Sequence, residues 1–184
     1  MIGFGTALAL GVVGVTGCGA SRPTSAEAAA AETAETVCTM LRDWDNSLSD
    51  AMNATSASIT DDDDPATANQ VLLDGFDEVI AIAESHVDEV DDLDLPAIPE
   101  RQRLVDELRA GAEEAVAGLE ADRAEAADLP PIGVSQQTGA LGGAMLAMEH
   151  AMSSVEPAIG TYDDEHLRAA FADNPGCQHV IQPF

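Results

Sequence analysis

The chain has 184 residues, of which 34 are acidic and only seven are basic, giving a formal net charge of −27 at pH 7. This length fits one domain that buries a real hydrophobic core. So negative a charge repels nucleic acid phosphates and anionic headgroups, which excludes nucleic-acid binding. Three interpretations of the acidity stay open: a solvated surface that keeps the protein soluble, adaptation to salt, and a surface for cations or a basic partner.

An uncharged apolar segment near the start of the chain ends in a cysteine motif. Residues 2–17 have the length of the apolar region of a signal peptide and fall short of the roughly 20 residues that a spanning helix needs. Val15-Thr16-Gly17-Cys18 follows the pattern of a bacterial lipobox, whose Cys becomes the lipidated first residue of the mature protein. We therefore expect residues 1–17 to be a signal peptide and Cys18 to carry the lipid. The alternatives are an uncleaved anchor and an ordinary signal peptide. Since no basic residue precedes the apolar run, we expect the true start codon to lie further upstream.

A low-complexity stretch follows the lipobox. It consists mostly of Ala, Ser, Thr and Glu, and we expect residues 18–35 to be the lipidated Cys and a flexible tether. Together with the absence of lysine and a compact helical remainder, these features resemble the small secreted lipoproteins of high-GC Gram-positive bacteria. The resemblance implies an extracytoplasmic address at the cell membrane, and it brings no known activity for residues 36–184.

Helical periodicity dominates residues 36–184, where apolar side chains recur at alternating spacings of three and four. This spacing predicts helices that pack at shallow crossing angles. Strand signals are nearly absent. The predicted core positions are, in the first segment, Val37, Leu41, Trp44, Leu48, Ala51 and Thr55; in the second, Leu72, Phe76, Val79, Ala83, Val87 and Val90; in the third, Leu104, Leu108, Ala112, Ala115 and Leu119; and in the fourth, Val134, Thr138, Leu141, Met145, Met148, Met152, Val155 and Ile159.

Proline-containing connections separate these segments. They cover residues 60–65, 93–99 and 129–133, and Pro ends a helix by removing an N–H donor and restricting the preceding residue. We interpret Asp61–Asp64 as a helix start, because the exposed N–H groups of a first helical turn are stabilised by negatively charged residues such as those ahead of Pro65. Short loops make neighbouring helices antiparallel, so the sequence predicts an all-α, up-down-up-down four-helix bundle. A short fifth helix is expected from about Asp163 to Ala172, ending at Asn174-Pro175-Gly176.

Two cysteines remain once Cys18 is lipidated. In an exported chain, Cys38 and Cys177 most simply form one disulfide, because neither Cys-x-x-Cys nor paired His motifs indicate zinc. Antiparallel topology places Cys38, near the start of the first helix, at the same end of the bundle as Cys177. We therefore predict a bridge between them.

Metal binding has few candidate residues. Met145, Met148 and Met152 form a thioether stripe of a kind that suits Cu(I), but His150 lies off that face and we favour core packing. His166 follows three acidic residues, a pattern that we interpret as helix capping. We therefore expect no metal or cofactor. Gly139, Gly142 and Gly143, in the fourth segment, indicate close helix packing, with a local bend or a small binding cleft as the alternative. Buried Trp44 needs a partner for its indole N–H.

The sequence therefore favours a non-enzymatic, lipid-anchored helical bundle on the outer face of the cytoplasmic membrane. It would present its acidic domain to a protein partner or to the envelope, with the membrane held through the lipid on Cys18. The main alternative is a lipoprotein that binds a metal or small ligand and delivers this cargo to a transporter. A sensory four-helix domain is the third hypothesis.

Overall fold

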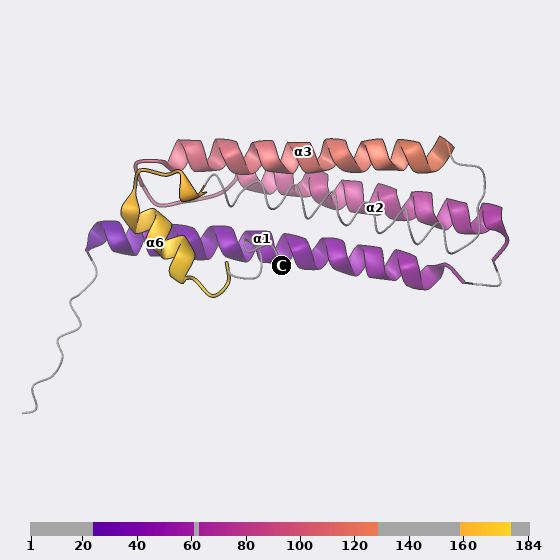
Figure 1. The fold of residues 1–184 in the computed structure, drawn as a ribbon, viewed down its shortest axis with the longest axis horizontal. Helices are drawn as coiled ribbons and strands as arrows, with labels where there is room; N and C mark the ends of the chain where they lie inside the picture. The colour runs from indigo at the N-terminus through magenta and orange to yellow at the C-terminus, as the bar shows by residue number, and fades with distance from the viewer. Residues whose placement is uncertain (1–23, 61–62, 129–158, 178–184) are drawn as a thin grey trace, which may run out of the picture.

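The computed structural model describes residues 24–60, 63–128 and 159–177, and four packed helices account for most of them (Figure 1). The long helices are α1 (Ser25–Ser58), α2 (Pro65–Asp91) and α3 (Arg101–Asp128), and α6 (Glu165–Asp173) is short. Helix α2 packs between α1 and α3 and runs antiparallel to both, while α6 crosses the N-terminal half of α1. These ranges contain no strand, so the predicted all-α class is confirmed for them.

Helix α1 begins earlier than the sequence analysis predicted. Thr24 caps it, since its hydroxyl accepts a hydrogen bond from Glu27 N at 3.2 Å and the Glu27 carboxylate accepts one from Thr24 N. Residues 25–35 are thus helical, and Ala30 and Ala34 are buried. The expectation of a flexible tether up to residue 35 is wrong for this stretch. Its alanines are strong helix formers, which favours the helix over a flexible chain.

The connection between α1 and α2 lies where the prolines and aspartates predict it. Asp64 is the N-cap of α2, and its Oδ1 accepts hydrogen bonds from Ala66 N and Thr67 N, each at 3.1 Å. Hydrogen bonds from the hydroxyl and backbone of Thr67 lower the pKa of Asp64. Pro65 occupies the first helical position, where no N–H is needed. The interpretation of this run as a helix start is confirmed at Asp64, while Asp61 and Asp62 lie outside the described residues.

The second connection, between α2 and α3, adds apolar residues to the core. Leu95 and Ile98 are both buried although they belong to neither helix. Arg101 supports the same segment, because its Nη2 donates to Leu93 O at 3.4 Å and its N–H donates to Ile98 O at 3.2 Å. The prolines predicted this loop correctly, and its two buried side chains close one end of the core.

The predicted core positions of the first three helical segments are confirmed with one exception. Every one of them is buried except Val87, which is half-buried and packs against the edge of the core. His86 is buried beside it, and the ring of His86 meets that of Trp44 on α1, with centroids 5.2 Å apart. The buried face of α2 is therefore turned slightly from the one that the periodicity indicated.

A close approach of α1 and α2 depends on one glycine. A Cβ built on Gly75 would lie 2.3 Å from Thr55 Cγ2 and 2.9 Å from Thr55 Cβ. Thr55 is buried, its side chain is β-branched, and its hydroxyl donates to Ala51 O at 3.0 Å, so it has little freedom to move. The two helices can therefore meet at this point only because residue 75 has no side chain.

The short C-terminal helix lies where the sequence predicts it, and it begins at the acidic residues that we interpret as its cap. Asp164 is its N-cap, accepting hydrogen bonds from His166 N at 2.9 Å and Leu167 N at 3.2 Å, and Asn174 is its C-cap. Of the predicted fourth segment only Ile159 is described, and it is buried as predicted; the rest of that segment, the loop at 129–133 and the signal peptide lie outside the described residues. Nowhere in the described ranges is a helix both long and apolar enough to cross a membrane.

Candidate functional site

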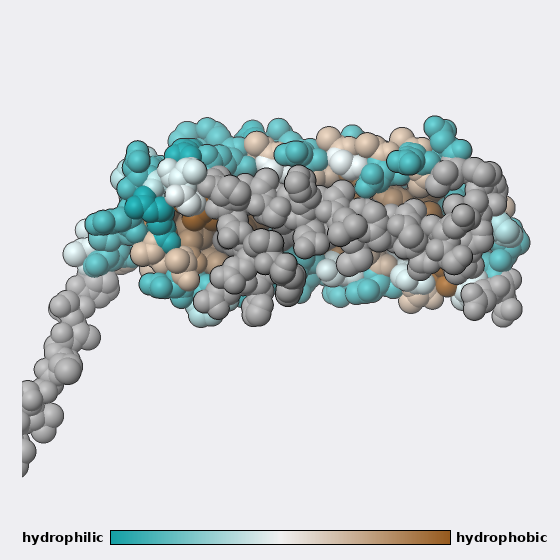
Figure 2. Space-filling model, viewed as in Figure 1, coloured by the Kyte–Doolittle hydropathy of each residue, from teal (hydrophilic) through white to brown (hydrophobic). Residues whose placement is uncertain are grey.

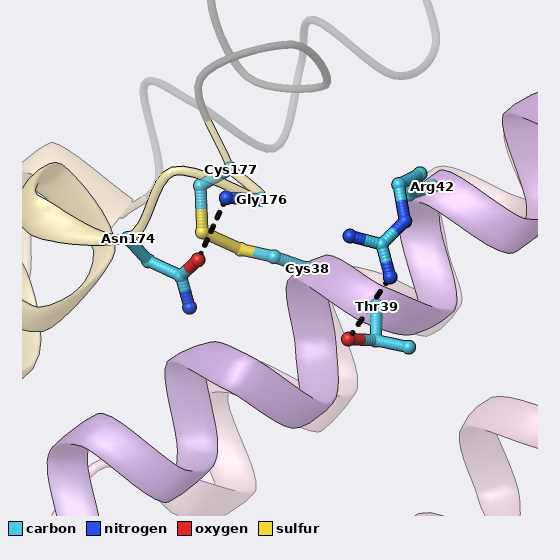
Figure 3. Close-up of a disulfide and its surroundings, with 6 residues drawn as sticks. All are labelled: Cys38, Thr39, Arg42, Asn174, Gly176 and Cys177. Carbon is cyan, nitrogen blue, oxygen red and sulfur yellow. Dashed lines mark hydrogen bonds between the residues drawn. A yellow bond between two sulfur atoms is a disulfide. The ribbon is translucent and has the colours of Figure 1, made fainter.

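One end of the molecule is fastened covalently. Cys38 on α1 and Cys177, just beyond α6, form a disulfide with their Cα atoms 5.0 Å apart, and both residues are buried (Figure 3). The Asn174 side chain shapes the turn that delivers Cys177: its Oδ1 accepts from Gly176 N at 2.8 Å and its backbone carbonyl accepts from Cys177 N at 3.0 Å. The predicted bridge is confirmed, and it fixes α6 against α1.

An open groove of about 800 Å³ lies beside this disulfide, between α1 and α6. Its basic side chains are Arg42 and His166, and its acidic ones are Glu27, Glu35 and Asp173. Arg42 is exposed and makes only loose contacts, 3.5 Å to Thr39 Oγ1 (Figure 3) and 3.9 Å to Asp43 Oδ1. The groove therefore presents mixed charge to solvent.

A polar cluster joins the start of α3 to the chain that enters α6. Tyr162 is buried and its Oη donates to Glu107 Oε2 at 2.6 Å. The Arg103 guanidinium lies 4.8 Å from the centre of the Tyr162 ring and pairs with Glu107 at 2.8 Å. Arg168 also donates to the Tyr162 carbonyl, and Glu100 Oε1 accepts from Asp163 N at 2.7 Å.

The electrostatics of this cluster favour a neutral tyrosine. Burial, followed by the hydrogen bond to the Glu107 carboxylate, raises the pKa of Tyr162 well above its ordinary value. The phenol is therefore a fixed hydrogen-bond donor at physiological pH. The hydrogen bond from Tyr162 to Glu107 therefore holds the chain that leads into α6 against the first turns of α3. We call this contact the polar clasp. Nothing in the local sequence around Tyr162 indicated the contact of its ring and hydroxyl with Arg103 and Glu107, because both lie 55 or more residues away.

The Trp44–His86 contact leaves polar atoms without ordinary partners. Trp44 Nε1 is buried, and no residue in the described ranges accepts a hydrogen bond from it, so the partner that its burial requires is not found among them. His86 Nδ1 lies 2.8 Å from Glu89 Oε2, yet without the geometry of a hydrogen bond. The two side chains are therefore in close contact at the edge of the core.

A second groove, of about 480 Å³, follows the outer seam between α2 and α3. Val87 and Val116 form its floor, both half-buried, and Ala117 lies beside them. Four carboxylates form its rim: Glu84, Asp88, Glu113 and Glu120. The sequence indicated these acids only as part of a general negative surface, and Figure 2 shows hydrophilic residues over much of the described surface. Their grouping depends on the register between two helices, which no local pattern reveals.

Metal chemistry gains no support from the described residues, among which no group of three His, Cys, Asp or Glu side chains could hold an ion. His166 lines the α1/α6 groove together with Glu27. The pKa of Glu27 is lowered first by its hydrogen bonds with Thr24, and His166 is the smallest of the causes. The methionine candidates Met145, Met148 and Met152 lie outside the described residues.

Comparison with known proteins adds no relationship to this picture. No protein-family model, no curated protein and no solved structure matches the chain.

Proposed function

We propose that the protein is a lipid-anchored helical module on the extracytoplasmic face of the cell membrane, which acts by binding a protein partner and not by catalysis. The observation that carries the proposal is the Cys38–Cys177 disulfide. Structural disulfides persist in oxidising compartments outside the cytosol. An exported protein needs a signal, and the apolar run that ends at Cys18 supplies one together with a lipidation motif.

The early start of α1 makes the proposed anchor short. Thr24, which caps α1, lies six positions after Cys18. A chain spans at most about 3.3–3.6 Å per residue, so the lipidated Cys would hold the first turn of α1 within ~20 Å. The end of the molecule that carries α6 and the disulfide would then face the membrane, and the turn between α1 and α2 would point away from it.

We also propose that residues 134–159 complete an up-down-up-down four-helix bundle. Support comes from where the described chain leaves and returns. It leaves α3 at Asp128 and returns at Ile159, next to the first turns of α3, where Tyr162 contacts Glu107. At 1.5 Å per residue, the 28 residues of α3 span ~42 Å, and a helix of similar length covers the return path.

The anchor is tested by replacing Cys18 with Ser in cells and measuring how the protein divides between membrane and soluble fractions. Ser21→Ala, three residues away and outside the lipobox, is the matched control. We expect Cys18→Ser to move the protein out of the membrane fraction and Ser21→Ala to leave it there. If the Cys18→Ser protein stays in the membrane at its unprocessed mass, residues 2–17 are the anchor and the lipoprotein proposal is wrong.

A second candidate function is the carriage of a small ligand to a transporter. The α1/α6 groove favours it, because ligand sites usually measure 300–1,000 Å³ and this one has about 800 Å³ beside two basic side chains. Native mass spectrometry of protein extracted from membranes tests it. Retained mass that is lost in an Arg42→Ala variant, but kept in Arg109→Ala, would favour the carrier. Protein recovered empty would count against it.

A further inference from the structure

Ion pairs neutralise the acidic side chains at both ends of the seam between α2 and α3, but not those in its middle. Asp77 pairs with Arg123, whose Nη2 lies 2.9 Å from Asp77 Oδ2, and Arg109 pairs with Asp91. Both pairs fit the same antiparallel register. The rim carboxylates of the α2/α3 groove lie between them, with Glu84 and Asp88 on one helix and Glu113 and Glu120 on the other.

No basic side chain of the described ranges pairs with these four carboxylates. Arg109 and Arg123 are engaged with Asp91 and Asp77, Arg42 lies in the α1/α6 groove, and Arg101, Arg103 and Arg168 have partners of their own elsewhere. Glu84 and Asp88 are a like-charge pair four positions apart, an arrangement that destabilises a helix. The middle of the seam thus carries carboxylates, as its two ends do, but it has no arginine to pair with them.

The floor of the groove is apolar, which distinguishes it from an ordinary acidic surface. Val87 and Val116 pack against the core with one side and face the groove with the other. The rim acids are too dispersed for one metal ion, since no group of three metal-binding side chains exists among the described residues. An extended ligand that carries several positive charges around an apolar side chain fits both features.

We propose that the α2/α3 groove binds a basic amphipathic segment of a partner protein, with lysine or arginine side chains on the rim carboxylates and an apolar side chain on Val87 and Val116. The partner's cations take the role that Arg109 and Arg123 play at the two ends of the seam. Glu113 and Glu120 are seven residues apart, about two helical turns, so the segment needs basic residues at a similar spacing. This inference rests on the proposed function, because it identifies the surface through which an interaction module would act.

The test measures binding of two synthetic 14-residue peptides to the full-length protein by isothermal titration calorimetry. One is an amphipathic Leu/Lys helix, and the other has the same composition in a scrambled order that removes the apolar face. We expect the amphipathic peptide to bind at least tenfold more tightly than the scrambled one. Equal affinities would mean general charge attraction and would overturn the proposal. So would binding that one Ca²⁺ per chain displaces at micromolar concentration.

Matched variants place the site. The groove variant combines Glu84→Gln, Asp88→Asn, Glu113→Gln and Glu120→Gln. The control removes four exposed carboxylates elsewhere, through Glu32→Gln, Asp50→Asn, Glu78→Gln and Glu125→Gln. We expect at least a tenfold loss of affinity in the first and less than a twofold loss in the second. Equal losses would overturn the proposal.

A single substitution and a separate readout complete the design. Ala117→Arg supplies a cation from within the groove and should block the peptide while the circular-dichroism melting curve stays cooperative. Unchanged affinity in this variant would overturn the proposal. Peptide binding reports on the groove alone and Cys18→Ser fractionation on the anchor alone, so failure of one is distinguishable from failure of the other.

Discussion

Helices α1 and α6 are held together by a covalent bond, whereas α2 and α3 are held by side chains alone. Helix α3 buries seven of its 28 residues, while α6 has nine residues and buries only Leu167 and Phe171. The disulfide therefore fastens the shortest of the four described helices, which has only two buried side chains to hold it, whereas α2 and α3 are long and pack without a covalent link.

The largest effect should come from removing the covalent link. In the double variant Cys38→Ser/Cys177→Ser, the loop closed across 139 positions is released, and the chain-entropy model gives a loss of about 5 kcal/mol. For a protein of this size, that corresponds to a melting temperature lower by ~10–20 °C. Differential scanning calorimetry measures it. A change below ~2 °C would mean that α6 is held by its side chains alone.

The next largest effect should come from a methyl group at the α1/α2 contact. Gly75→Ala places a Cβ against Thr55, and overpacking of this kind costs about 1–3 kcal/mol. Gly118→Ala in α3 is the matched control, because no atom lies within 4 Å of its added Cβ. Relief of glycine's backbone entropy should stabilise that variant by about 0.5–1 kcal/mol. Urea denaturation should therefore give opposite signs, and equal signs would contradict the close approach.

The polar clasp should show a smaller effect with a distinct pH signature. Tyr162→Phe removes the hydrogen bond to the Glu107 carboxylate and should cost about 1–2 kcal/mol near neutral pH. Because the pKa of Tyr162 is raised in the folded state, its stabilising contribution is complete below the unfolded value of 10.0 and is lost as the pH rises beyond it.

Denaturation midpoints measured at neutral pH and above about pH 10 check this dependence, since an ordinary tyrosine ionises near that value. We expect the wild type to lose more stability than Tyr162→Phe over this interval. Parallel losses in the two proteins would show that Tyr162 ionises as freely in the folded state as in the unfolded one.

The smallest effect should come from the ion pair that crosses the α2/α3 seam. Arg123 holds the pKa of Asp77 below its ordinary value, so the pair stabilises the fold above the unfolded pKa of Asp77 and loses this contribution as the pH falls through the folded one. Both side chains are partly exposed, and salt screens such pairs. Arg123→Ala should lower the melting temperature slightly at low salt and neutral pH. A difference that persists in 1 M NaCl would point to packing of the Arg123 side chain instead.

The sequence alone predicted most of what depends on local chemistry. Pro65 and Asp64 mark a helix start through fixed backbone geometry and capping, and both lie at that start in the structure. The apolar spacing identified Trp44 and Leu108 as core residues because helical periodicity decides which side chains share a face. The pairing of Cys38 with Cys177 followed from antiparallel topology.

The remaining features depend either on local sequence patterns that fit more than one structure or on contacts between residues far apart in the sequence. The stretch around Ala30 has the composition of a linker, although Thr24 and Glu27 already form the capping-box pattern that starts a helix. Tyr162 meets Glu107 only after the chain has folded back across 55 positions. The grouping of acids around Val87 and Val116 requires the relative register of two helices, which their separate periodicities leave undetermined.

The position of the disulfide also governs what a protease can do to this molecule. Every peptide bond between Cys38 and Cys177 lies inside one covalent ring. A single cut anywhere in that ring opens the chain without separating the pieces, and both halves stay joined through sulfur. A nicked molecule would therefore keep its C-terminal half tied to α1. Only reduction of the bridge, or a second cut, releases a fragment.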